Sequence, residues 1–359
     1  MFASSKILPV IVPSYNMEKY LPKCLGSLVV APELMERLEV LVVNDGSKDR
    51  TSEIAHEFAA KWPNTFKVID KANGHYGSCI NAALRKVTGR YIKILDADDY
   101  VVTEEFYGCL RDLADEDSDL VISDFTPVDP DGRIIFTKTY PLPGRENLVI
   151  EDVGPGIRSL SVHSIIYKRT VFEGWNYRQL EGISYTDCQW VSEPMLRVRT
   201  VKYWPGVVTC YLFGREGQSV SPDCRIRSID QQIKVDLYLA GIHASGKPEW
   251  SAQGAWDYFE RLLYSELREI YAMSMFGYRG KASRLLTGKQ FDQCLKEVDV
   301  EAWSVMPTRD KVNVTIAGIL KFNIVKLART RFAYWVIGWI LQKYSILLYR
   351  FGTAGCRCS

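Results

Sequence analysis

The stretch "YIKILDADDY", residues 91–100, places three aspartates directly after a run of mostly apolar residues. Carboxylates this close repel one another and raise one another's pKa, so the cluster costs stability unless positive charge lies among them. Asp96 and Asp98 supply the hard oxygen ligands that Mg²⁺ or Mn²⁺ takes together with phosphate oxygens and water. The alternative is that the aspartates cap the next helix, for which one of them would be enough. We therefore predict a divalent-metal site that holds a diphosphate.

Composition indicates a folded, cytoplasmic protein. The chain has 359 residues, of which 47% are hydrophobic and 25% charged, enough for one large domain with an addition or for two domains. The chain has nine cysteines and no CxxC spacing. An odd number of cysteines fits poorly with a disulfide framework and favours a reducing compartment. The short apolar run at 7–12 is interrupted by Pro9 and is more typical of a first strand than of a signal peptide.

Strand and helix patterns alternate in the first third of the chain. The apolar segments are nearly continuous, which is typical of parallel strands covered by helices on both faces. A helix pattern from residue 78 ends at Gly89, which we expect to be its C-cap. Beyond residue 125 the sequence is rich in turns, with a hairpin indicated at 129–132, and beyond 225 it is mainly helical. The predicted strands are centred on "KILPVIVP", "LEVLVV", "FKVID", "YIKIL" and "DLVISDF".

Polar residues follow the first four predicted strands where each one ends. Ligands of such sheets bind beyond the carboxyl ends of the strands, so these four loops should line one edge. Asp45 is either a turn residue beside Gly46 or an acceptor for a nucleobase N–H. Gly74 and Gly77 precede a helix and let backbone N–H groups approach a phosphate. The four loops begin at Pro13, Asn44, Asp70 and Asp96.

Several motifs together resemble the inverting family 2 glycosyltransferases of the GT-A fold. They are "VIVPSYNMEKYLPKCLGSL", "EVLVVNDGSKDRT", "NGHYGSCINAALRKVTGRYIKILDADD", "ISYTDCQW" and "YLFGREGQSVS", and their order covers residues 6 to about 220. The resemblance implies an α/β fold with a central, mostly parallel sheet flanked by helices, followed by a helical C-terminal extension. It also implies transfer of a sugar from a nucleoside diphosphate donor, with UDP as the expected nucleotide.

The resemblance also assigns roles to residues of the donor site. Asp96, Ala97 and Asp98 would form the DxD element, with Asp98 as principal metal ligand and Asp96 as the second. An arginine often found in the family near Asn81 is absent, because the sequence reads Cys79-Ile80-Asn81. Neutralisation of the diphosphate would then depend more on the metal and on Lys71 or Arg215. The remaining expected donor-binding residues are Pro13, Tyr15, Asn16, Asp45, Gly74 and Asn81.

On the acceptor side, Asp187 in "SYTDCQW" resembles the family's catalytic carboxylate. It would take the proton of the attacking hydroxyl as general base, and a single displacement would invert the anomeric centre. Glu181 and Glu193 are the alternatives, and Asp187 could also be only a helix N-cap. We expect His163 and Trp190 to contact the acceptor, although a lone histidine is more often structural and aromatics of this kind more often pack in a core.

The chain is expected to divide into three parts. Residues 1–225 would form the glycosyltransferase domain, with a nucleotide-sugar half at 1–125 and an acceptor half at 126–225, and residues 226–310 a helical extension. Residues 311–359 carry eight basic residues and no acidic one beside an apolar, aromatic run. This composition favours a helix on an anionic membrane at the inner face of the cell membrane, against a helix packed on the body or a true span. We expect a glycan or polyprenyl-diphosphate-linked acceptor and no nucleic-acid partner.

Three other functions are weighed against this interpretation. A sugar-phosphate nucleotidyltransferase would open with a glycine-rich G-x-G-T-R-like loop, and a dehydrogenase with GxGxxG, whereas the first strand here leads into "PSYNMEKY". A catalytically inactive nucleotide-sugar or glycan-binding protein could keep the fold. The presence of Asp45, Asp96, Asp98 and Asp187 argues against that alternative.

Overall fold

The computed structural model describes residues 6–140, 142, 147–157, 159–215, 217–276 and 283–306. The expected membrane segment at 311–359 lies outside these residues. The described chain falls into two compact units, one made of residues up to 215 together with 250–256, and one made of 217–249 and the residues from 257 onward. The boundary expected at residue 225 falls within the second of these units.

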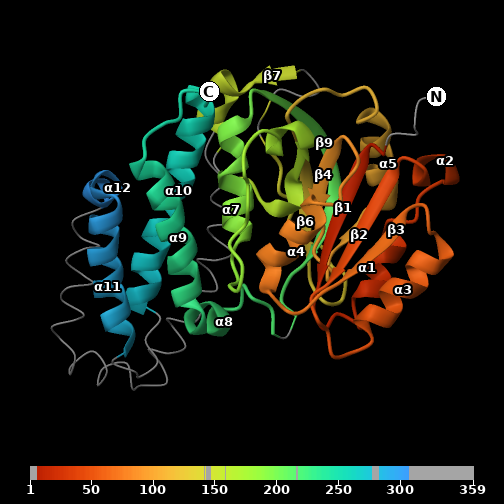
Figure 1. The fold of residues 1–359 in the computed structure, drawn as a ribbon, viewed down its shortest axis with the longest axis horizontal. Coiled ribbons are helices and arrows are strands. Elements are labelled where there is room, and N and C mark those ends of the chain that lie inside the picture. The colour runs from red at the N-terminus through yellow and green to blue at the C-terminus, as the bar shows by residue number, and fades with distance from the viewer. Residues whose placement is uncertain are drawn as a thin grey trace. The chain divides into compact units, whose positions relative to one another are not determined.

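The first unit is built on one mixed sheet (Figure 1). Its strands follow the order β3-β2-β1-β4-β8-β6-β9-β5, and β7 pairs with β9. The neighbours β3, β2, β1 and β4 are parallel, as the sequence predicts. Strand β8 lies antiparallel between β4 and β6, while β6 and β9 are parallel. The strands are β1 (Leu8–Ser14), β2 (Leu38–Asn44), β3 (Phe66–Asp70), β4 (Tyr91–Ile94), β5 (Tyr100–Val101), β6 (Leu120–Val128), β7 (Asn147–Val149), β8 (Ile165–Lys168) and β9 (Thr200–Leu212).

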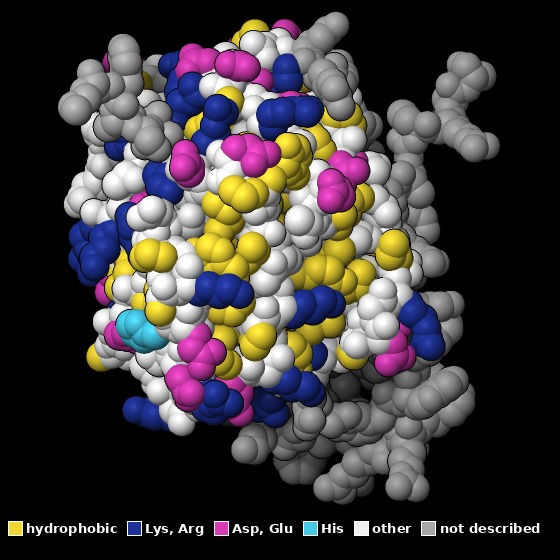
Figure 2. Space-filling view, turned by 90° about the vertical axis from the view of Figure 1, so that its right-hand side faces the viewer, with side chains coloured by type: hydrophobic (Ala, Val, Ile, Leu, Met, Phe, Trp, Pro, Cys, Tyr) yellow, Lys and Arg dark blue, Asp and Glu magenta, His cyan; other side chains and the backbone are white. Residues whose placement is uncertain are grey.

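Helices cover both faces of the parallel part of the sheet. On one face, side chains of α1 (Leu21–Ser27), α2 (Pro32–Met35), α3 (Thr51–Lys61) and α5 (Thr103–Asp112) join a core cluster with alternate residues of β1 and β2. This alternation follows from the two-residue period of a strand. Helix α4 (His75–Leu84) packs on β1 and β2 from the opposite face (Figure 1). The molecular surface toward α2 and α3 mixes hydrophobic side chains with Lys and Arg (Figure 2).

Short elements connect the later strands, and longer helices follow them. Between β7 and β9 the chain forms α6 (Ile150–Val153), α7 (Asp187–Ser192) and four 3₁₀ turns at Gly154–Gly156, Val162–Ser164, Arg169–Phe172 and Pro194–Arg197. The later helices are α8 (Pro222–Arg227), α9 (Ile229–Ala244), α10 (Gln253–Phe276), α11 (Ser283–Val298) and α12 (Val300–Val305). Among the described residues, none of the helices combines the length and the apolar character that crossing a bilayer requires.

Of two local expectations, one differs from the structure and one agrees with it. Helix α4 ends at Leu84 with Arg85 as its C-cap, so Gly89 is not a helix cap. A Cβ atom at Gly89 would lie 2.3 Å from Cδ of Pro9, which shows that this glycine is needed for a close approach of two chain segments. The hairpin expected at 129–132 is present as a turn in which the Gly132 N–H donates to the Asp129 carbonyl, and antiparallel bridges Val128–Ile134 and Phe125–Lys138 flank it.

Helix α4 also touches the segment before α7 at very short range. A Cβ atom at Gly77 would lie 2.0 Å from the Leu180 carbonyl oxygen. Beside it, the Gly182 N–H donates a hydrogen bond of 2.9 Å to the Gly74 carbonyl. The absence of a side chain at Gly77 therefore fixes how closely the segment around residue 180 approaches α4.

We expect Gly77→Ala to destabilise the protein, because the new methyl group must push the backbone at Leu180 away. The free energy of unfolding should fall by about 1–3 kcal/mol, measured by urea denaturation. Gly26→Ala in α1 is the matched control, since a Cβ atom there meets nothing within 4 Å. It should be neutral or stabilising by up to about 1 kcal/mol. Equal effects of the two substitutions would contradict this account of α4 packing.

Candidate active site

The carboxyl ends of the parallel strands meet at one edge, as expected. Ser14 at the end of β1 pairs in register with Asn44 of β2, and Asn44 pairs with Asp70 of β3. On the other side of β1, Ile11 is in register with Ile94 of β4. The residues that follow these four strands therefore come together although they are up to about 80 positions apart in sequence.

A buried ion pair occupies the β2 and β3 ends. The Asp45 carboxylate accepts hydrogen bonds from Lys71 Nζ at 2.6 Å and from the Gly74 N–H at 3.0 Å. Lys71 Nζ also donates to the Ser78 hydroxyl at 2.8 Å and to the Ala72 carbonyl. The sequence assigned Asp45, Lys71 and Gly74 to the donor site separately, and the structure joins them directly at the start of α4.

The loops along this edge have strained backbone. Asn16, His75 and Tyr185 are the non-glycine residues with positive φ in the described chain, at 54°, 65° and 66°. Asn16 follows β1, where its N–H donates to the Ser47 hydroxyl and its side-chain oxygen accepts from the Lys48 N–H. His75 starts α4, and Tyr185 precedes α7. Such strain persists only where the surroundings hold it, and it gathers at functional sites.

Residues 13–15 border the same edge from the end of β1. Pro13 is half-buried, and Tyr15 is exposed. An exposed aromatic ring beside Asn16 is available to a planar ligand. Donor contacts by Pro13, Tyr15 and Asn16 stay predictions.

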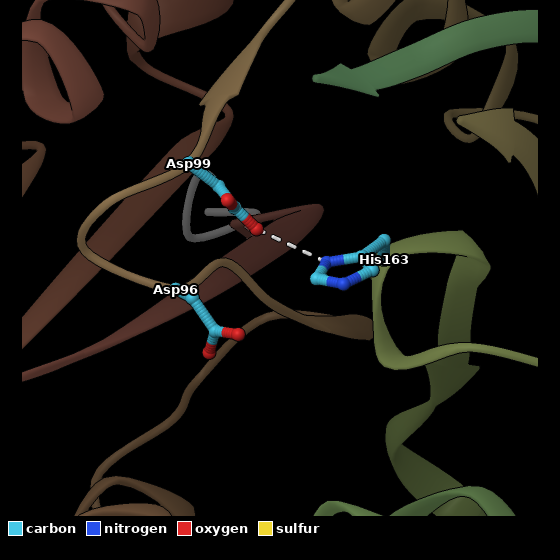
Figure 3. A group of neighbouring side chains, drawn as sticks. All are labelled: Asp96, Asp99 and His163. Atoms are coloured by element: carbon cyan, nitrogen blue, oxygen red, sulfur yellow. Dashed lines mark ion pairs between the residues drawn. The ribbon is translucent and has the colours of Figure 1, made fainter. Parts of the chain in front are cut away.

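A compact polar group lies at the end of β4 and involves Asp96, Asp99 and His163. One potential ligand atom from each residue lies within 4.8 Å of the other two. Figure 3 shows Asp99 directed at His163, with Oδ2 and Nδ1 3.1 Å apart, and Asp96 on the same loop. Asp99 also accepts the Leu212 N–H at 2.9 Å, and the Tyr76 hydroxyl donates to Asp96 at 3.0 Å.

The pKa shifts of these residues indicate an excess of negative charge that the neighbouring residues do not neutralise. Burial and the charge of Asp99 raise the pKa of Asp96 to about 7. Burial and the charge of Asp98 raise the pKa of Asp99 well above its usual range. Burial lowers the pKa of His163 to about 4, so its ring is neutral near pH 7. A divalent cation would relieve this repulsion, and carboxylate oxygens with a neutral imidazole are suitable ligands.

The group differs from the metal site that the sequence predicts. It shares Asp96 with the prediction but contains Asp99 and His163 in place of Asp98. Asp98 instead pairs with the Arg215 guanidinium, which follows β9 and lies over the Tyr20 ring. The prediction that Asp96 and Asp98 bind the metal stays untested, and so does a donor contact by Ala97, which is buried between them.

Asp187 influences residues of the same group electrostatically. It is the first residue of α7 and its side chain is exposed. Its negative charge raises the pKa of Tyr76, which is bonded to Asp96, and opposes the lowering of the pKa of His163. The charge of Asp187 therefore reaches the two residues that contact Asp96 and Asp99.

The two alternative bases have less suitable surroundings. Glu193 is buried and accepts a hydrogen bond of 2.6 Å from Gln189. Glu181 is bonded to the Asn81 amide, which lowers its pKa and makes it a weaker base. Asp187 remains the exposed carboxylate at the start of α7.

Two predicted contact residues are buried instead. Trp190 has no exposed surface, its ring is stacked on Phe172 at 5.1 Å, and it also contacts Tyr167. A ring enclosed in this way offers no face to an acceptor, which corrects the prediction for Trp190. His163 is also largely buried and stacks on Tyr211 at 4.3 Å, so an acceptor contact by His163 stays a prediction.

Asn81 is fully engaged with the chain before α7. Its amide nitrogen donates to the Gln179 carbonyl and to Glu181, and its oxygen accepts the Gln179 N–H. The side chain is buried. In the structure Asn81 therefore holds the backbone at Gln179, and its predicted donor contact stays untested.

Sequence reasoning assigned no role to three residues of the site. Asp99 belongs to the quoted aspartate cluster, Tyr76 lies between Gly74 and Gly77 in the first turn of α4, and Ser78 follows two positions later. For Asp99 the signal is the third carboxylate itself, since two suffice for a DxD element. No sequence pattern near Tyr76 or Ser78 predicts their role, because the fold of the sheet brings their partners Asp96 and Lys71 to them.

Comparison with known proteins finds a family model that matches part of the chain. Residues 10–175 match the model of glycosyl transferase family 2. The chain carries a family 2 glycosyltransferase domain. An uncharacterized glycosyltransferase of Mycoplasma genitalium is 28% identical over 252 residues, covering 67% of this chain and 80% of that protein. The Bacillus subtilis minor teichoic acid biosynthesis protein GgaB is 37% identical over 102 residues, covering 28% of this chain and 11% of GgaB.

The solved structures confirm the fold of this family 2 domain. The crystal structure of S. aureus TarS residues 1–349 in complex with UDP-GlcNAc superposes with a TM-score of 0.62 at 19% identity. The match covers 87% of this chain and 90% of the TarS chain. The predicted GT-A fold with a helical C-terminal region is therefore correct.

We expect Lys71→Met to lower the free energy of unfolding by about 2 kcal/mol or more, because it leaves the buried Asp45 carboxylate without its cation. The double variant Asp45→Asn/Lys71→Met should regain at least half of this loss, since no charge is then left buried. Urea denaturation measures both values.

The matched control is Arg50→Met, which removes an ion pair to Glu53 in which both side chains are more than half exposed. It should cost less than about 1 kcal/mol. A double variant as unstable as Lys71→Met alone would show that the buried charge is not the cause.

Proposed function

We propose that this chain transfers one sugar from a UDP-linked donor to a hydroxyl group of a glycan or polyprenyl-diphosphate-linked acceptor, with inversion at the anomeric carbon. One observation carries the proposal. The charge of Asp187 reaches Tyr76, which is bonded to Asp96, and His163, which is paired with Asp99. The proposed base would then act beside a carboxylate cluster that suits a cation, as a displacement between acceptor and nucleoside diphosphate requires.

On the donor side, we place the nucleoside at the ends of β1 and β2. Asp45 would accept a hydrogen bond from uracil or the ribose, and Tyr15 and Asn16 would border the base. Lys71 and Arg215 are the cations within reach of the diphosphate, and both are bonded to site carboxylates. The complex of TarS with UDP-GlcNAc supports a UDP-linked donor.

The carboxylate cluster would hold the metal. Asp96 and Asp98 are the proposed ligands of Mg²⁺ or Mn²⁺, and Asp99 and His163 lie beside Asp96. When bound, the ion would supply positive charge to the leaving diphosphate. Within the chain, Arg215 would move from Asp98 to the diphosphate, exchanging one carboxylate partner for another anion.

At the acceptor, the exposed Asp187 carboxylate would accept the proton of the attacking hydroxyl. The proton transfer makes the oxygen a better nucleophile as it attacks the anomeric carbon from the side opposite the diphosphate. Because only one displacement occurs, the configuration is inverted. The negative charges of Asp187 and of the neighbouring aspartates would stabilise the positive charge that develops on the sugar.

The biological setting is proposed from composition and relatives. The name of GgaB supports a role in making a cell-surface polymer. We assign catalysis to residues 1–225 and contact with an anionic membrane at the inner face of the cell membrane to the basic, apolar residues 311–359. Unchanged partition between membrane and soluble fractions after deletion of 311–359 would reject the membrane contact.

We expect UDP to raise the melting temperature of the protein when Mn²⁺ is present and much less in EDTA. A ligand at 100 times its Kd stabilises the native state by about 2.7 kcal/mol. Asp98→Asn should lose most of the shift because a predicted metal ligand is gone. Asp131→Asn in an exposed turn is the matched control and should keep it. An equal shift in EDTA would contradict metal-dependent donor binding.

We expect Asp187→Asn to lower turnover by about 10²–10⁴-fold while the Kd for UDP stays within about threefold. The readout is release of UDP from a panel of UDP-sugars with Mn²⁺, with water as acceptor. Wild-type turnover retained by Asp187→Asn would refute the base assignment. Binding of UDP without any turnover by the wild type would instead favour the catalytically inactive binding protein.

A further inference from the structure

The backbone that carries Asp187 is held by a chain of buried amide groups. Gln179 donates from its side-chain nitrogen to the Thr186 carbonyl at 3.0 Å, and Thr186 immediately precedes Asp187. Asn81 on α4 in turn fixes the backbone of Gln179. The Gln179 N–H donates to the Asn81 side-chain oxygen at 2.9 Å, and the Asn81 side-chain nitrogen donates to the Gln179 carbonyl at 2.8 Å. Asn81, Gln179 and Thr186 are all at most 4% exposed.

A second glutamine fixes the same segment from α7. The Gln189 side-chain oxygen accepts the Leu180 N–H at 2.9 Å, and its nitrogen donates to the Arg178 carbonyl at 3.0 Å. Residues 178–180 are therefore bonded on one side to α4 through Asn81 and on the other to α7 through Gln189. The Asn81 contacts are buried and the Gln189 contacts are partly buried, and a buried polar group that loses its partner is costly.

This bracing has to hold a strained loop in one conformation. Gly182 and Tyr185 have φ of 76° and 66°, and Tyr185 is not a glycine. Strain of this kind persists only when surrounding contacts over-determine the backbone. A loop that relaxed would move Asp187, and a displacement of about 1 Å at a reacting group costs about 100-fold in rate.

We propose that Asn81 is a positioning residue that acts on the reaction through Gln179 and Thr186 by fixing the place of the Asp187 carboxylate. This inference rests on the proposed function, in which Asp187 is the base. It gives Asn81 a role different from the predicted donor contact. Helix α4 then serves both substrates, because its first turn bonds to Asp45 through Gly74 and its later turn places the base.

The test is a double-mutant cycle between Asn81→Leu and Asp187→Asn. UDP release from a UDP-sugar and UDP affinity are measured in Mn²⁺, with water as acceptor. Asn81→Leu should lower kcat by about 100-fold and leave the Kd for UDP within threefold. In the Asp187→Asn background the same substitution should cost less than about threefold, since residues that act as one unit are not additive.

Three results would overturn the inference. One is an equal loss of kcat from Asn81→Leu in the wild-type and in the Asp187→Asn background, which would indicate a general structural effect. Another is a tenfold or larger weakening of UDP binding with kcat unchanged, which marks a donor contact. Full turnover by Asp187→Asn would refute the base assignment of the proposed function, which the other two results leave intact.

Two further variants guard against a folding defect. Gln189→Met removes the second brace while keeping the length of the side chain, and it should give the same loss of kcat with UDP affinity retained. Thr65→Val is the matched control. Thr65 immediately precedes β3, and the substitution removes a buried hydrogen bond of 2.7 Å from its hydroxyl to the Met35 carbonyl. Its kcat should stay within twofold of the wild type, and an equal loss in Thr65→Val would overturn the inference.

Discussion

Repulsion among the three carboxylates that follow β4 is the constraint around which the site is arranged. Each has a donor from elsewhere in the chain: the Tyr76 hydroxyl of α4 for Asp96, and the Arg215 guanidinium and Leu212 N–H at the end of β9 for Asp98 and Asp99. These donors offset the repulsion incompletely, because the pKa of Asp96 is still raised to about 7. A site that stays short of positive charge is suited to attract a cation and the diphosphate that accompanies it.

Helix α4 connects this cluster to the rest of the site. Its first residues bond to Asp45 through Gly74 and to Asp96 through Tyr76, and Asn81 near its end holds Gln179. The absence of a side chain at Gly77 lets the segment near Leu180 lie directly against the helix. One rigid element thus relates the proposed nucleotide, metal and base positions to one another, and such sites are more precise than sites made of loops alone.

The loop before α7 shows how strain is distributed around this element. Left-handed backbone at Tyr185 costs free energy that the buried amides of Gln179 and Gln189 offset. In a low-dielectric interior these hydrogen bonds are strong, and losing one leaves an unpaired polar group. The loop therefore has one preferred conformation without lying deep in the hydrophobic core, which leaves Asp187 exposed to an acceptor.

The sequence by itself determined the parallel strands, the edge at which their polar ends meet, and the identity of the main carboxylates. Each of these depends on local patterns: continuous apolar runs, turn residues and the spacing of aspartates. Only the tertiary structure decided that Trp190 packs in the core, that Asp99 pairs with His163, and that Asn81 braces the chain before Asp187. The reason is that these contacts join residues tens of positions apart, and a side chain's partner across such a distance is set by how the strands and helices pack, which no local pattern records.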